Sequence, residues 1–340
     1  MENQKKVNFK QFFIENSAFV ILVLLVIIAI AIQGTTFLSL NNIANILLNN
    51  AIVGIIALGM TIIIISGGID LSVGSGAAMV GLVTLTTINA TGSIFVGVLA
   101  AFGTGIVMGA FNGVLVSHFR IPAFIATLGA MQIFRSLSLN WWQGGGMLLG
   151  RLGGITLDID VLGFLRFSNT RLFTGVIDGF TVGIPLPVLY WIALTVIMAL
   201  FCKKTALGRH IYAVGSNERA ANLSSVKVKR VKILVFVISG ALVAFAALVE
   251  ASRLGSMNSA TSGQMYELRA IAAVIVGGTA MSGGRGSPIG TLFGALTLGV
   301  INNVMNLIGI PGFLVDAVQG TILILAVLLQ RSMVKADKAY

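Results

Sequence analysis

The chain has 340 residues, of which 56% are hydrophobic and only 10% are charged, and its mean hydropathy is +0.99. A soluble protein of this length carries about 25% charged residues on its surface, so the composition excludes a soluble multidomain enzyme and predicts a polytopic membrane protein. The 22 Lys and Arg against 11 Asp and Glu give a net charge of +11. In a membrane protein this excess indicates basic loops held on one side, so no nucleic-acid partner is expected.

The N-terminal segment is predicted to be an uncleaved first helix, because its apolar core lacks a cleavage site and more apolar segments follow. The sequence therefore predicts an all-α polytopic protein with about ten transmembrane helices, in a single domain over 1–340. Several segments are shorter than the roughly 20 residues of a straight crossing. Such segments persist only where protein or a water-filled cavity shields their backbone. The ten predicted spans are 18–32, 46–65, 76–88, 94–117, 122–139, 186–202, 232–250, 268–282, 288–308 and 314–330.

Counting the charges of the loops between these spans predicts the orientation. With a cytoplasmic N-terminus, the inner loops and tails hold 16 Lys and Arg and the outer loops hold 4. This asymmetry obeys the positive-inside rule and places both termini in the cytoplasm. Two connections are long: an extracytoplasmic loop at 140–185 and a basic cytoplasmic loop at 203–231.

Small residues recur at helical spacing within two spans. Gly105, Gly109 and Gly113 lie in the fourth span, and Gly290 and Gly294 lie in the ninth. Such spacing lets helix backbones approach closely in lipid, so helix packing is predicted, with pore lining as the alternative.

Two pairs of similar phrases raise the question of an internal repeat. SGGID at 66–70 resembles SGGRG at 282–286, and Asn112 with IPAF at 121–124 resembles Asn303 with IPGF at 310–313. The spacing between the two phrases differs in the two halves. Ten spans allow a five-plus-five inverted repeat, and the sequence leaves this arrangement open.

The polar residues within the predicted spans are mostly neutral amides. Amides offer donors and acceptors without a trapping charge, which suits the passage of a neutral hydroxylated solute, although each also suits helix–helix hydrogen bonding. The predicted translocation residues are Asn112, Gln132, Asn302, Asn303 and Asn306.

Ionisable residues near the spans are few, and three of them are predicted to have structural or gating roles. Asp70 is placed to accept hydrogen bonds from a helix N-terminus. Glu267 and Arg269 are two residues apart and do not face each other on a helix. Two partners remain open for the Arg269 charge: Glu267 nearby and Asp316 across the bundle. The scarcity of acidic residues argues against proton coupling and leaves sodium coupling open.

No cofactor is expected in this chain. Cys202 is the only cysteine, and His118 and His210 are the only histidines, so neither a disulfide nor a metal site is predicted. The Gly-rich phrases lack the GK[ST] end of a phosphate-binding loop. No paired carboxylate or His/Asp cluster supports catalysis, so no catalytic residue is predicted and the chain is not expected to be an enzyme.

The inner loop contains two Gly-punctuated turns that flank a short amphipathic helix beginning near Asn217. The small pair Ala220 and Ala221 on this exposed helix suits docking into a groove of another protein, although a solvated basic loop is the simpler alternative.

At this point the chain resembles a known family, the permease subunits of ribose- and galactose-type sugar ABC importers. The shared phrases are GIDLSVGS at 68–75, PAFIATLG at 122–129, LGR at 207–209, AVG at 213–215, AA at 220–221, YEL at 266–268, AIAAV at 270–274 and GGT at 277–279. Two positions depart from the family pattern: Ser225 stands where Gly is usual, and Arg269 stands where an acidic residue is usual.

The resemblance implies a multi-pass protein of the bacterial plasma (inner) membrane. Its partners would be a cytoplasmic ABC ATPase that binds ATP and Mg, a second permease copy or paralogue, and an extracytoplasmic solute-binding protein that delivers a monosaccharide. The ATPase-coupling residues implied by the match are Gly208, Arg209, Gly215, Asn217, Glu218, Ala220 and Ala221. The alternative function is an ion-coupled secondary carrier of a small polar solute.

Overall fold

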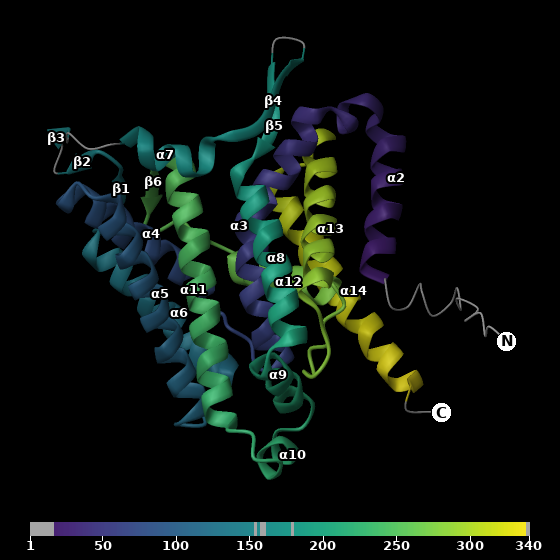
Figure 1. Ribbon diagram of the computed structural model, residues 1–340. Helices are drawn as coiled ribbons and strands as arrows, with labels where there is room; N and C mark the ends of the chain where they lie inside the picture. Colours follow the sequence, from purple (N-terminus) through teal and green to yellow (C-terminus); the bar gives the residue numbers. More distant parts are fainter. Residues whose placement is uncertain (1–16, 153–154, 157–160, 178–179, 338–340) are drawn as a thin grey trace.

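The computed structural model describes residues 17–152, 155–156, 161–177 and 180–337 as a bundle of long helices with short strands at one end (Figure 1). A short helix, α12 (Tyr266–Val276), lies inside the bundle. The long helices are α2 (Ser17–Leu38), α3 (Leu40–Ile65), α4 (Val73–Thr91), α5 (Ile94–Ser117), α6 (Ala123–Trp141), α8 (Leu186–Lys204), α11 (Val228–Leu254), α13 (Pro288–Leu307) and α14 (Gly312–Asp337).

Each of the ten predicted spans overlaps one helix of the structure, although the ends differ by several residues in some of them. Among the described residues, seven helices are long and apolar enough to cross a membrane, so a polytopic membrane protein is confirmed and the count of ten stays a prediction. The predicted span 268–282 is wrong at its end, because α12 stops at Val276. Gly278 has a φ of 86°, a left-handed conformation that turns the chain out of the helix.

The core is built around α3. Its second half is a run of isoleucines and small residues that is buried on all sides, as expected for a helix surrounded by other helices. The helices α8, α11, α12 and α13 all pack against it. In contrast, α2 exposes large apolar side chains along most of its length, including Leu24 and Ile27, which suits a helix that faces lipid.

The α5–α11 contact is as close as two helix backbones allow. A methyl group on Gly105 would overlap the carbonyl oxygen of Gly240, and one on Gly109 would overlap the carbonyl oxygen of Phe236. In the second glycine-rich span, a methyl group on Gly294 would overlap the carbonyl oxygen of Ala273 in α12. The predicted packing role of these glycines is confirmed, because small residues are what permit such approaches.

The prediction of an all-α protein is wrong for the outer loop, which contains the strands of two antiparallel hairpins, one strand of a third antiparallel pair, and the helix α7 (Val161–Asn169). β1 (Gly146–Leu148) pairs with β6 (Ser256–Asn258), which lies after α11, so the loop is joined to a segment distant in sequence. β2 (Arg151–Leu152) pairs with β3 (Ile155–Thr156). β4 (Arg171–Ile177) pairs with β5 (Phe180–Pro185), and these two strands project beyond the helices as a hairpin (Figure 1).

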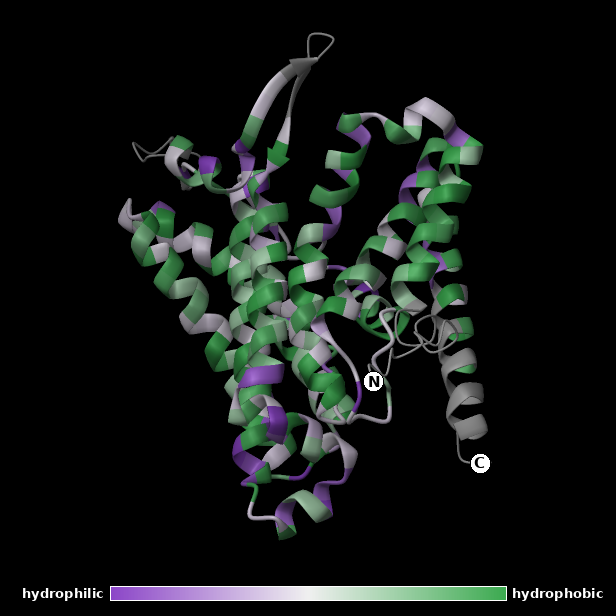
Figure 2. Cartoon of the chain, turned by 45° about the vertical axis from the view of Figure 1, so that its right-hand side comes forward, coloured by the Kyte–Doolittle hydropathy of each residue, from purple (hydrophilic) through white to green (hydrophobic). Residues whose placement is uncertain are grey.

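The opposite end of the bundle carries α9 (Ala206–Ser216) and α10 (Glu218–Leu223), and hydrophilic residues gather there (Figure 2). Apolar residues cover the helices between the two ends. The predicted inner loop and the predicted outer loop therefore lie at opposite ends (Figure 1). The cytoplasmic location of both termini stays a prediction, and Lys5, Lys6 and Lys10 lie outside the described residues.

The two pairs of similar phrases do not occupy equivalent places. SGGID precedes α4, and IPAF follows α5, whereas SGGRG and IPGF flank the single helix α13. One extra helix therefore separates the phrases in the first half. The inverted five-plus-five repeat stays a prediction.

We predict that Gly109→Leu destabilises the protein by about 3 kcal/mol or more. The leucine side chain would overlap the backbone of α11, and a helix backbone cannot shift to make room without losing its own packing. The thermal midpoint of the detergent-solubilised protein measures this loss.

Gly103→Leu is the matched control, because it lies on the same helix with nothing within 4 Å of the added carbon. An equal loss of stability in both variants would contradict the packing role of α5.

Candidate functional site

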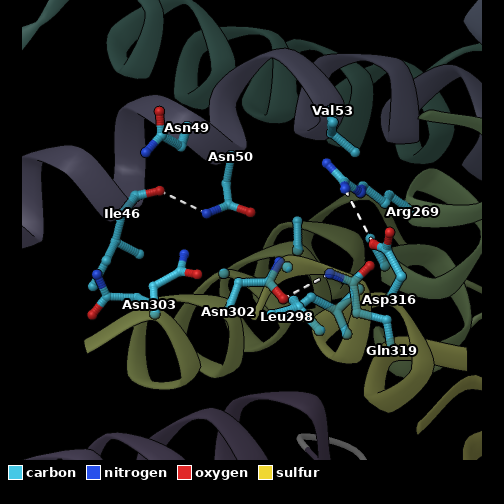
Figure 3. A pocket seen from close by; sticks show the side chains of 16 residues that line it. Ile46, Asn49, Asn50, Val53, Arg269, Leu298, Asn302, Asn303, Asp316 and Gln319 are labelled. Carbon is cyan, nitrogen blue, oxygen red and sulfur yellow. Dashed lines mark hydrogen bonds and ion pairs between the residues drawn. The ribbon is translucent and has the colours of Figure 1, made fainter. Parts of the chain in front are cut away.

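A cavity of about 420 Å³ lies between α3, α12, α13 and α14 (Figure 3). Its walls are polar at many points: 16 residues line it, including five Asn and one Gln. These amides are Asn49, Asn50, Asn302, Asn303, Asn306 and Gln319. A chain that is 56% hydrophobic thus concentrates neutral hydrogen-bonding groups at one place inside the bundle.

Several of these amides are held by hydrogen bonds. The Gln319 side chain donates to Oδ1 of Asn302 at 2.7 Å, which joins α14 to α13. Asn303 and Asn42 exchange two hydrogen bonds of 2.7 and 3.0 Å, which join α13 to α3. Because their partners fix the side chains, the amides present a preformed polar wall rather than a loose one.

One ion pair also lies in the cavity (Figure 3). The Arg269 guanidinium on α12 lies 3.4 Å from the Asp316 carboxylate on α14, and 39% and 44% of the two side chains are exposed. Of the two partners predicted for Arg269, the structure therefore selects Asp316. The pair keeps the charged groups of the cavity balanced, and it ties α12 to α14.

The structure brings together only some of the predicted translocation residues. Asn302, Asn303 and Asn306 line the cavity, whereas Asn112 is 1% exposed and donates to the Ser72 hydroxyl at 2.8 Å. Gln132 is exposed on α6, outside the cavity. Sequence reasoning missed Asn49, Asn50 and Gln319. The signal for the first two was the polar Asn49–Asn50 pair within the mostly apolar predicted span 46–65.

Asp70 has the hydrogen bonds that were predicted for it. Its Oδ1 accepts from the backbone N–H of Ser72 at 2.8 Å and from the Ser72 hydroxyl at 2.7 Å. Ser72 is the residue that caps α4, so Asp70 fixes the start of that helix. The Thr127 hydroxyl of α6 accepts from the N–H of Leu71 at 3.0 Å and completes the support of this turn.

A second irregular segment, 259–265, precedes α12 and is held by Arg135. This guanidinium donates to the carbonyl oxygens of Ser259 at 2.8 Å and Ser262 at 3.0 Å. Glu267 follows this segment, where α12 meets the start of α4: a methyl group on Gly74 would overlap both the Glu267 carboxylate and the Gly263 carbonyl. Glu267 thus lies outside the cavity, and a gating role for it or for Asp70 stays a prediction.

The segment predicted to couple to an ATPase forms two helices, α9 and α10. Gly208 and Gly215 lie within α9, so the prediction of two Gly-punctuated turns is wrong. Both glycines are needed for close approach: a methyl group on Gly208 would overlap the carbonyl oxygens of Phe201 and Cys202. The predicted helix start is correct, since the Asn217 side chain caps α10 by accepting from the N–H of Ala220 at 3.0 Å.

The end of α9 meets the ends of two distant segments. A methyl group on Gly215 would overlap the carbonyl oxygen of Ile65, the last residue of α3. That same carbonyl accepts from the N–H of Gly284 at 2.8 Å. The Tyr212 hydroxyl donates to the carbonyl oxygen of Gly286 at 2.8 Å. The two Gly-rich phrases of the sequence, at 66–75 and 282–287, are therefore joined to each other and to α9.

Tyr212 keeps its proton in this position. Burial raises the pKa of its hydroxyl to about 12, and the neighbouring Cys202 adds to the rise. The hydroxyl therefore remains a hydrogen-bond donor to Gly286 throughout the physiological pH range.

The exposed side chains of α9 and α10 differ from the prediction at one residue. Arg209, Asn217 and Ala220 are exposed, whereas Ala221 is only 6% exposed and packs into the protein core. The Glu218 carboxylate is exposed but forms an ion pair of 2.7 Å with Lys232 of α11. Ala220 is therefore the small residue that α10 presents outward.

Ser225, one of the two departures from the family pattern, follows α10 in a left-handed conformation with a φ of 65°. Glycine adopts this conformation without steric cost, whereas a residue with a Cβ does not. The geometry thus supplies a reason why glycine is usual at this turn.

Comparisons with known proteins give a consistent result. A family model described as branched-chain amino acid transport system / permease component matches residues 42–327. The ribose import permease protein of Haemophilus influenzae is 37% identical, with 94% of this chain and 93% of that protein aligned. The xylose transport system permease protein of the same organism is 33% identical, with 92% and 94% aligned. A probable ABC transporter permease protein of Escherichia coli is 37% identical, with 95% and 92% aligned. No solved structure matches.

We predict that reversing one charge of the Arg269–Asp316 pair lowers stability and that reversing both restores it. Because both side chains are more than a third exposed, each single change, Arg269→Asp or Asp316→Arg, should cost at most about 1 kcal/mol from the pair itself. Thermal midpoints of the two single variants and the double variant give the coupling energy. Additive losses would contradict a direct pair.

We also predict that Ser225→Gly raises the free energy of unfolding by at most about 1 kcal/mol, because it removes a left-handed Cβ. The extra entropy of glycine in the unfolded chain offsets part of this gain. Ser224→Gly is the control: Ser224 has a φ of −83°, so its replacement should lower stability. Thermal midpoints that change in the same direction in both variants would contradict the strain at Ser225.

Proposed function

Because the chain belongs to the permease component family of bacterial transport systems, we propose that it is the membrane-spanning subunit of an ATP-driven ABC importer for a monosaccharide or a similar small hydroxylated solute. It is a multi-pass protein of the bacterial plasma membrane. The observation that carries the proposal is the cavity lined by six amides and one balanced ion pair.

The chemistry of the cavity supports a neutral hydroxylated solute. Asn and Gln side chains both donate and accept hydrogen bonds, as sugar hydroxyls do. The family model carries the name of branched-chain amino acid transport, but an amino acid would need groups for its ammonium and its carboxylate. In this cavity Arg269 and Asp316 already neutralise each other. The names of the ribose and xylose permeases that the chain resembles favour the same solute class.

The absence of a large aromatic surface in the wall suits transit rather than tight binding. Of the 16 lining residues, none is aromatic, so no ring stacks on a sugar and holds it. Affinity for the solute then belongs to a separate extracytoplasmic binding protein. The end of the bundle that carries α7 and the β4–β5 hairpin is the surface proposed to receive it (Figure 1).

ATP and Mg are proposed to bind a separate cytoplasmic ATPase that docks on α9 and α10. The proposed docking residues are Gly208, Arg209, Gly215, Asn217, Glu218, Ala220 and Ala221, of which Gly208, Gly215 and Ala221 act by packing α9 and α10 and not by direct contact. The chain itself is not an enzyme. A second permease copy or paralogue is proposed to complete the pore, as the transport-system permease family implies.

The contacts of α9 supply a route from the ATPase to the cavity. Gly215 touches the end of α3, and Tyr212 holds the turn that leads into α13. Both α3 and α13 line the cavity. A movement of α9 therefore acts on two walls of the cavity at once, which is what switching between inward-open and outward-open states requires.

Co-purification tests the ATPase partner. We expect the tagged chain, extracted in mild detergent, to recover an ABC ATPase, and Ala220→Trp to reduce the recovered ATPase at least about tenfold, because a large side chain at a docking centre disrupts packing. Leu162→Trp, on α7 at the opposite end and 65% exposed, should leave the recovery unchanged. Recovery of no ATPase by the unaltered chain would favour an ion-coupled carrier.

A charge exchange separates two roles of Glu218. If Glu218 only pairs with Lys232, Glu218→Lys combined with Lys232→Glu should restore solute uptake that Glu218→Lys alone removes. If Glu218 contacts the ATPase, the double variant should remain defective in uptake. We expect the second result, and full rescue would remove Glu218 from the docking surface.

A further inference from the structure

A second, larger cavity opens at the end of the bundle that carries α9 and α10. It has a volume of about 830 Å³ and lies between the α5–α6 turn, the Gly67–Gly68 turn, α10 and the first turns of α11. Glu218, one of the proposed ATPase-docking residues, lies on its rim, and we refer to this cavity as the basic groove.

Four cations and one acid line the basic groove. The cations are Arg120 in the α5–α6 turn, Arg219 on α10, and Lys229 and Lys232 on α11. Lys232 is neutralised by Glu218 at 2.7 Å. Arg120, Arg219 and Lys229 form no ion pair with any residue that the structure describes, so the groove has an excess positive charge from three separate elements.

The groove also contains a buried hydroxyl that lacks a partner. Ser117 lines it, is only 5% exposed, and its Oγ has no hydrogen-bond partner within the described chain. A buried polar group without a partner is costly. A ligand that carries hydroxyl or phosphate oxygens would satisfy it.

Part of the remaining wall of the groove is apolar, and the groove lies at one end of the membrane-spanning helices. Val116, Phe124 and Phe236 line it, and Phe124 is 53% exposed. The groove lies where the spans Ile94–Ser117 and Val228–Leu254 end and begin. This is the level of lipid headgroups, and a basic pocket between transmembrane helices on the positively charged side matches an anionic headgroup.

From these observations we propose that the basic groove binds the headgroup of an anionic phospholipid of the inner leaflet. The phosphate lies among Arg120, Arg219 and Lys229, a headgroup oxygen reaches Ser117, and an acyl chain follows Phe124. The bound lipid holds α10 against the α5–α6 turn. This role concerns the membrane and not the solute, so it stands or falls separately from the transport function.

An acidic surface of a partner protein is the competing occupant. The basic wall alone fits both occupants. The apolar wall favours the lipid, because an acidic protein surface would leave Phe124, which is 53% exposed, without an apolar partner.

Lipid titration of the purified, delipidated full-length protein tests the proposal. We expect phosphatidylglycerol to raise the thermal midpoint and to remain bound in native mass spectra, and phosphatidylcholine with identical acyl chains to do neither. Water-soluble glycerol phosphate at the same concentration should have no effect. If glycerol phosphate raises the thermal midpoint as much as phosphatidylglycerol does, the groove binds free phosphate. If phosphatidylcholine does so, the groove does not recognise the negative charge of the headgroup. Either result overturns the proposal.

Two triple variants with the same change in net charge locate the site. Arg120→Gln, Arg219→Gln and Lys229→Gln together should weaken phosphatidylglycerol binding on the order of a hundredfold, at roughly fivefold for each cation. The control combines Lys203→Gln, Lys227→Gln and Arg230→Gln, three exposed cations at the same end that do not line the groove. Equal weakening in both triple variants would assign the effect to diffuse charge and overturn the proposal.

Two further measurements complete the test. Ser117→Ala should weaken phosphatidylglycerol binding several-fold while the thermal midpoint without lipid stays the same or rises, because the variant removes an unsatisfied hydroxyl. Unchanged lipid affinity would remove Ser117 from the site. If the co-purifying ATPase, added to the titration, displaces the lipid completely, the groove is a protein-docking surface and the proposal is overturned.

Discussion

The contact between Gly215 and the carbonyl oxygen of Ile65 is the constraint on which the inner end of this protein depends. No side chain fits between the two backbones, so α9 rests directly on the end of α3. The N–H of Gly284 donates to that same carbonyl at 2.8 Å, and Tyr212 donates to Gly286. Three segments that are distant in sequence therefore meet without an intervening flexible side chain. Packed backbones transmit displacement because they do not deform gradually.

The polar groups inside the bundle divide into two classes by what they contact. Thr127 and Arg135, both on α6, bind backbone groups of the irregular segments that precede α4 and α12. Irregular backbone at membrane depth has to be satisfied by protein, since lipid offers no hydrogen bonds. The second class, which includes Asn50, Asn302 and Gln319, faces the cavity between α3 and α14. The first class maintains the fold, whereas the second is placed to meet a solute.

The broken helices connect these two classes. Because α12 is short and begins only after the 259–265 segment, Arg269 on its first turn lies in the cavity, where it pairs with Asp316. The short α12, the α6 side chains that hold the segment before it, and the ion pair in the cavity therefore depend on one another. Together they connect the outer loop and the cavity to the inner turn at Gly284.

The sequence by itself determined the membrane class, the positions of the ten apolar helices, the packing role of Gly105 and Gly109, the hydrogen bonds of Asp70 at a helix start, and the start of α10 near Asn217. Each of these depends on composition or on neighbours close along the chain. Only the tertiary structure decided that Asn49 and Gln319 join Asn302 at one cavity while Asn112 and Gln132 do not, and that Ala221 is buried and Ala220 exposed. A single helix face does not reveal which neighbour it meets. β1 escaped prediction for the same physical reason, since it pairs with β6 across more than a hundred residues and no local pattern encodes such a partner.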